Sequence, residues 1–271
     1  TKRHQWSTSP GVGLNFIDYQ RTRPIGIRCM ECHASYINYL PGTGQQLNGL
    51  EEFNKRSLVC RIDCERCHGP GAEHADFQAQ HPEIKTARFI ATNSSLTRNQ
   101  KLDMCAVCHS GRHRFMLRSS FGFMPGDTFA KFKMPDFSER IDTAHLDVHG
   151  NQLQLLQSSK CFLYSKMDCT TCHNVHQNNH GDDAFYTQKC LSCHNSPNHT
   201  YCKLTGKISA GALKTNCISC HMPALPSKII SVQVAGKLQV AGKLPTVQFF
   251  IHTHHIAIYP REVKRILAYI N

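Results

Sequence analysis

The chain has 271 residues, a formal net charge of +12, 15 cysteines and 18 histidines. A chain of this length normally forms one or two domains with a sizeable core. No apolar stretch approaches the length of a membrane span, so the sequence predicts no transmembrane segment. Taken alone, the positive charge would favour an anionic partner.

Helix signals occur at four places along the chain. They are cap residues before a periodic segment, apolar positions at helical spacing, and an initiating Asp or Pro. The first predicted helix is capped by 94–97 and runs into 105–109, with Gly111 just beyond its end. The other three cover 150–165, the segment from Asp182 to about His194, and 261–270 after Pro260. In 229–234 and 246–259, β-branched and aromatic residues predict a small β-hairpin near the C-terminus.

The pentapeptide Cys-x-x-Cys-His occurs six times. At the chain's own Cys and His frequencies, roughly 0.05 copies would arise by chance. Each copy has the pattern of a c-type haem attachment site, where two thiols form thioethers and the His is the proximal iron ligand. The sequence therefore predicts six covalently bound haem c groups. The attachment cysteines are Cys29, Cys32, Cys64, Cys67, Cys105, Cys108, Cys169, Cys172, Cys190, Cys193, Cys217 and Cys220, and the proximal ligands are His33, His68, His109, His173, His194 and His221.

Structural zinc is the main alternative for paired cysteines. A zinc site needs a second Cys pair, and nothing in a zinc half-site requires the next residue to be His. All six pairs here carry that His. The pattern therefore favours haem over zinc, and over a redox-active Cys-x-x-Cys.

Six haems would leave about 45 residues for each. The haems would then supply much of the apolar interior, and regular secondary structure would be sparse. We therefore expect a mainly α, haem-packed multihaem cytochrome c with much irregular structure. The motifs run from Cys29 to His221 without a linker-like stretch, so residues 1–271 are predicted to form a single domain.

The same haems change the meaning of the positive charge. Each would bring two propionates, up to about −12 in all, so much of the Lys and Arg excess would offset them. Nucleic acid is therefore not an expected partner. Covalent haem attachment takes place outside the cytoplasm, which predicts a periplasmic or extracellular protein.

Twelve histidines remain for the second axial position that a low-spin haem requires. After Cys64–His68 the chain continues Gly-Pro-Gly-Ala-Glu-His74, and after Cys169–His173 it continues Asn-Val-His176. These runs resemble the broad multihaem cytochrome c family that includes cytochrome c-554, the decahaem cytochromes and the nitrite and hydroxylamine enzymes. The resemblance implies that His74 and His176 each bind the iron of a different haem from the one attached just before it.

Other distal ligands are expected from local context. The segment around His149 looks like the isolated distal-ligand segments of that family. His199 and His254 follow as candidates, and His4 is proposed for the first haem. His145 and His255 are alternative candidates for the role given to His4. The other four histidines are expected to face solvent: His81, His113, His180 and His252.

Three cysteines lie outside the motifs. Cys161 and Cys202 bracket two of the motifs, and a disulfide between them fits an oxidising compartment. Cys60 is expected to be a buried thiol.

The leading functional hypothesis is an electron carrier with a chain of six bis-His haems. Its partners would be redox proteins or an extracellular acceptor, and head-to-tail self-assembly could continue the chain of haems. The alternative is a reductase or oxidase of a small nitrogen or sulfur species, which needs one open iron. Related nitrite reductases mark that haem with Cys-x-x-Cys-Lys, whereas all six motifs here end in His.

The first prediction concerns stoichiometry. The intact mass should exceed the polypeptide mass by six haems, and acid–acetone should not extract them because thioether bonds are covalent. Five or fewer haems on fully matured protein would contradict the assignment of the motifs.

Overall fold

The computed structural model describes residues 25–40, 52–111, 115–134, 146–195, 202–233 and 246–270. The chain divides into two compact units. The N-terminal unit is Asp18–Phe137, and the C-terminal unit takes in Ser138–Asn271. The first three Cys-x-x-Cys-His motifs belong to the N-terminal unit and the last three to the C-terminal unit. The expectation of a single domain stays a prediction.

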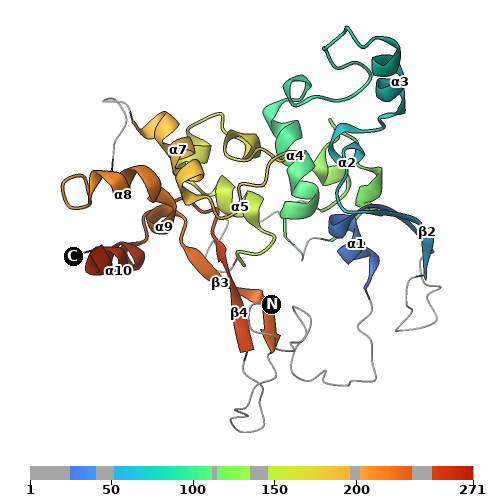
Figure 1. The fold of residues 1–271 in the computed structure, drawn as a ribbon. Coiled ribbons are helices and arrows are strands. Elements are labelled where there is room, and N and C mark those ends of the chain that lie inside the picture. Colours follow the sequence, from blue (N-terminus) through green and yellow to red (C-terminus); the bar gives the residue numbers. More distant parts are fainter. Residues whose placement is uncertain are drawn as a thin grey trace, which may run out of the picture. The chain divides into compact units, whose positions relative to one another are not determined.

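The N-terminal unit combines short helical turns with one two-stranded sheet (Figure 1). β1 pairs antiparallel with β2, with an irregular register near the start of β1. This sheet was not predicted, because most of its side chains are exposed and show no apolar alternation. Its elements are α1 (Ile27–His33), β1 (Ala34–Leu40), β2 (Glu52–Cys60), α2 (Glu65–His68), α3 (Ala72–Gln80), η2 (Asn93–Ser95), α4 (Arg98–His109), η3 (Ser120–Gly122) and η4 (Phe129–Lys131).

The core of the N-terminal unit surrounds α4. Leu102, Ala106 and Val107 on this helix are buried, and α4 contacts both α1 and η4. Phe123 and Phe132 are also buried, with ring centroids 5.2 Å apart. This small apolar cluster holds the first and third motifs in one unit.

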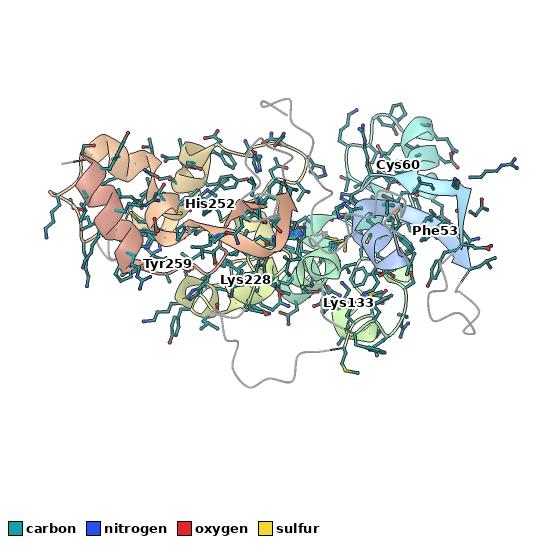
Figure 2. The ribbon with its side chains drawn as sticks, turned by 90° about the horizontal axis from the view of Figure 1, so that it is seen from below. Phe53, Cys60, Lys133, Lys228, His252 and Tyr259 are labelled. Carbon is teal, nitrogen blue, oxygen red and sulfur yellow. The ribbon has the colours of Figure 1, made fainter. Side chains whose placement is uncertain are left out.

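The C-terminal unit packs α7 against α8 and α9, and α9 against α10 (Figure 1). β3 and β4 pair antiparallel with an irregularity between Pro226 and Ser231, and Figure 2 shows Lys228 and His252 on these two strands. Its elements are α5 (Gln152–Gln157), α6 (Lys160–Leu163), η5 (Cys169–Thr171), α7 (Asp183–His194), α8 (Ala210–Thr215), α9 (Cys217–His221), β3 (Ala224–Gln233), β4 (Thr246–His252) and α10 (Pro260–Ile270).

Most of the predicted elements are confirmed. α4, α7 and α10 lie where helices were expected, and β3 with β4 forms the expected hairpin. The strand does not continue through 253–259. The prediction of one helix over 150–165 is wrong. The segment forms two helices, α5 and α6, because Ser159 adopts an extended backbone between them. Within the described ranges, no helix has the length and apolar character needed to cross a bilayer.

The N-terminus of α4 provides a stability test. Thr97 and Gln100 form a reciprocal capping box, with the Gln100 amide donating to Thr97 Oγ1 and the Thr97 amide donating to Gln100 Oε1 at 2.9 Å. Thr97→Ala should lower the free energy of unfolding by about 1 kcal/mol, measured by denaturant titration. Thr97→Ser keeps the hydroxyl and should retain most of that stability; equal losses in both variants would contradict the role of the cap.

Candidate functional site: the Cys-x-x-Cys-His turns

Each Cys-x-x-Cys-His motif forms a turn of helix. Residues at i, i+3 and i+4 of a helix share one face, so the two cysteines and the histidine of a motif lie together. In the fourth motif, only the first three residues form a helical turn, which is of the 3-10 type. The His173 amide donates a hydrogen bond to the Cys169 carbonyl at 3.0 Å. The other five motifs end α1, α2, α4, α7 and α9 at His33, His68, His109, His194 and His221. This is the local geometry that attachment to one porphyrin requires.

Two of these histidines have a ring nitrogen held by a distant carbonyl. His68 Nδ1 lies 2.6 Å from the Ala91 carbonyl oxygen, and His221 Nδ1 lies 3.0 Å from that of Ala257. A carbonyl can only accept, so Nδ1 carries the proton in both rings. That tautomer presents Nε2 to a metal, which is the usual arrangement of ligating histidines.

The clearest pairing of two histidines is in the C-terminal unit. The ring centroids of His173 and His254 lie 6.1 Å apart, and the ring planes differ by 24°. Two imidazoles on one metal need about 2.0 Å for each metal–nitrogen bond and about 1.1 Å from each nitrogen to its ring centre, or about 6.2 Å in total. The observed centroid spacing is close to this sum, and the two ring planes are roughly parallel.

Ser159 places His254 opposite the fourth motif. Its side chain is fully buried, and its hydroxyl donates to the His254 carbonyl at 3.2 Å and accepts from the Ile256 amide at 2.8 Å. The same hydroxyl lies 3.3 Å from the Leu155 carbonyl at the end of α5. Ser159, which lies between α5 and α6, thus binds the loop that carries His254, almost a hundred residues later in the chain.

The remaining predicted distal ligands are distributed over both units. His74 lies on α3, with Nδ1 2.8 Å from the Arg88 carbonyl oxygen, the same arrangement as His68. His176 follows η5, and its amide donates to Asn174 Oδ1 at 3.1 Å. The ligand roles of His74 and His176 stay predictions. His4, His199, His113 and His145 lie outside the described residues.

His149 is held against the C-terminal hairpin by a buried carboxylate. Asp147 Oδ1 accepts from the His149 amide and from Ser227 Oγ, each at 2.8 Å, and Asp147 Oδ2 accepts from the Lys228 amide. Figure 2 labels Lys228 on this strand. The loop that carries this predicted ligand is therefore fixed to β3.

His252, for which a solvent-facing role was expected, is exposed as predicted. Its Nδ1 lies 2.6 Å from the Met222 carbonyl oxygen, which presents Nε2 in the same way as in His68, His74 and His221. The partner carbonyl is thirty residues away in sequence. No local pattern could have revealed this contact, because it depends on the pairing of β3 with β4.

Cysteines of different motifs lie beside each other. Cys32 Sγ is 4.0 Å from the Cys108 carbonyl, and Cys108 Sγ is 3.9 Å from the Glu31 carbonyl. The hydrogen bond between the two thiols lowers the pKa of Cys32 to about 7 and raises that of Cys108. In the C-terminal unit, the thiol of Cys190 likewise lowers the pKa of Cys217 to about 7. Motifs one and three, and motifs five and six, are therefore neighbours.

Charged side chains join the turns of the N-terminal unit. Arg66, inside the second motif, donates to the Glu31 carbonyl at 3.1 Å and to the Ser120 carbonyl at 2.6 Å. The Glu31 carboxylate is buried and accepts from the Ser120 amide at 2.9 Å. Lys133, labelled in Figure 2, is buried and donates to the Val107 carbonyl at 2.6 Å. The variable residues of the motifs therefore hold neighbouring turns together.

Two expectations for the remaining cysteines are wrong. All fifteen cysteines lie in the described ranges, and none of them is in a disulfide. Burial raises the pKa of Cys161. Cys161 and Cys202 are both free thiols, so the Cys161–Cys202 bridge is not formed. Cys60 is exposed at the end of β2 instead of buried.

Comparison with protein-family models, with curated proteins and with solved structures finds no match to this chain. In the part of the chain that the structure describes, no group of three or more His, Cys, Asp or Glu side chains is arranged to hold a bare metal ion. A haem iron takes only two ligands from the protein, because the porphyrin supplies the other four.

The His173–His254 pair can be tested by substitution. His254→Ala should convert one ferric haem of the holoprotein from low spin to high spin, measured by absorption and electron paramagnetic resonance, because its iron loses one axial ligand. His255 is the next residue, so the double variant His254→Ala, His255→Ala prevents replacement by the neighbour. His180→Ala, an exposed position in the same unit, is the control. A fully low-spin double variant would contradict the pairing.

Proposed function

We propose that this protein is a multihaem c-type cytochrome that transfers electrons over six covalently bound haems. The observation that carries the proposal is the spacing of His173 and His254, since it fits two imidazoles on one iron. The six helical Cys-x-x-Cys-His turns support it independently. When bound, each haem would supply a one-electron couple whose potential depends on its axial ligands and surroundings.

The chain itself would provide attachment, ligation and orientation. The twelve motif cysteines would form the thioethers, and the six motif histidines would be the proximal ligands. Nδ1 contacts such as His68 with Ala91 and His221 with Ala257 would hold the imidazole planes still. Two fixed imidazoles leave an iron no open position, which favours electron transfer over substrate binding.

Exposed apolar side chains are consistent with surfaces that a porphyrin would cover. Phe89, Phe115, Phe250 and Ile258 are each between 60% and 69% exposed. Contiguous apolar surface marks a binding site, and a covalently attached porphyrin would supply such a partner at any of these side chains. They lie in both units, as expected if haems were attached along the whole chain.

The proposed partners follow from the same chemistry. They are other redox proteins or an extracellular electron acceptor, in the periplasm or outside the cell. Head-to-tail contact between copies of this chain would continue the series of haems, and it needs only a non-closing heterologous contact. A nucleic-acid partner is not proposed, because haem propionates would offset much of the positive charge.

The experiment that tests the proposal combines spectroscopy with turnover. The ferric holoprotein should contain only low-spin iron, a small donor should reduce all six haems, and nitrite and hydroxylamine turnover should stay at background. A high-spin haem together with robust turnover of either substrate would replace the carrier by the alternative, a reductase or oxidase with one open iron.

A further inference from the structure

We infer that Tyr186 is a positioning residue that holds the axial imidazole of the fourth motif and sets the potential of that one haem. The inference rests on the proposed function. Tyr186 lies on α7, the helix that ends in the fifth motif, yet its hydroxyl oxygen is 3.3 Å from Nδ1 of His173 in the fourth motif. One side chain therefore connects two of the six attachment turns.

The direction of this hydrogen bond follows from the histidine pair. If Nε2 of His173 faces the position between His173 and His254, Nδ1 carries the proton. The tyrosine oxygen then accepts, as the Ala91 and Ala257 carbonyls do at His68 and His221. The His173 and Tyr186 ring centroids are 5.3 Å apart with planes at 60°, so the phenol also limits rotation of the imidazole.

Several contacts fix Tyr186 on α7. Asp182 caps the helix by accepting from the Phe185 amide at 2.8 Å, and the rings of Phe185 and Tyr186 meet edge to face at 5.3 Å. The next residue, Thr187, is fully buried and accepts from the Cys217 amide at 3.1 Å. These contacts set the rotation of α7, and with it the place of the tyrosine hydroxyl.

Tyr186 also contacts the fifth motif through its backbone. Cys190 Sγ lies 3.5 Å from the Tyr186 carbonyl oxygen. The hydroxyl of this residue therefore meets the proximal ligand of motif four, and its carbonyl meets an attachment cysteine of motif five. A change in the side chain alone would affect the first contact and leave the second in place.

The expected effect on the potential has a definite sign. An acceptor at Nδ1–H makes the imidazole a stronger electron donor, which stabilises oxidised iron. Removing the tyrosine oxygen should therefore make the potential of that haem more positive. At His68 and His221 the acceptor is a backbone carbonyl, so no side-chain substitution removes it.

The experiment is Tyr186→Phe in the full-length holoprotein. Spectroelectrochemical titration should show one of six haems shifted to a more positive potential, by roughly tenfold in its equilibrium constant or about 59 mV. Haem stoichiometry and the low-spin spectrum should stay as in the parent protein. Tyr164→Phe, at a tyrosine that is 86% exposed, is the matched control and should shift none of the haems.

The outcomes separate this inference from the proposed function. Six unchanged potentials in Tyr186→Phe, or shifts spread over several haems, would overturn the role of Tyr186 while leaving a six-haem parent protein intact. If Tyr186→Phe loses haem during maturation, electron paramagnetic resonance of Tyr186→Trp should still show an altered signal for one ferric haem, because the imidazole plane is no longer held. An unaltered signal would overturn the inference. A parent protein without six haems would instead defeat the proposed function.

Discussion

The interaction on which this architecture depends is the close approach of two imidazoles, His173 and His254, whose ring centroids lie 6.1 Å apart. Two imidazoles bound to one iron would have ring centres about 6.2 Å apart. His173 and His254 come close to that distance although one follows η5 and the other follows β4. Buried Ser159 maintains it by binding the His254 loop to the end of α5. The break between two short helices thus helps to hold His254 near His173.

Around the other Cys-x-x-Cys-His turns, local and distant residues likewise have separate roles. The motif supplies two thiols and an imidazole on one helical face, and distant backbone groups then orient the ring. His68 is held by Ala91, and His221 by Ala257, a residue of the segment that follows β4. Charged residues inside the motifs, Glu31 and Arg66, join neighbouring turns through Ser120. Few of these contacts need regular secondary structure, which accounts for the short elements.

The positions of helices could be predicted where the end signals are local. Thr97 caps α4 and Asp182 caps α7, and both helices end at the His of a motif. Prediction failed where a distant partner decides the conformation. The segment 150–165 has apolar spacing typical of one helix, but Ser159 leaves the helix to bind His254 and Ile256. The positions of Cys161 and Cys202 in the sequence favoured a disulfide, yet both are free thiols.

The sequence by itself determined the chemistry of the candidate sites. Six Cys-x-x-Cys-His pentapeptides predict haem attachment and one ligand each, because those residues would act through local helical spacing. Only the tertiary structure decided that His173 lies near His254, that motifs one and three and motifs five and six are neighbours, and that Tyr186 contacts His173 and His252 contacts the Met222 carbonyl. The physical reason is that these contacts join residues many positions apart, and no local pattern encodes their partners.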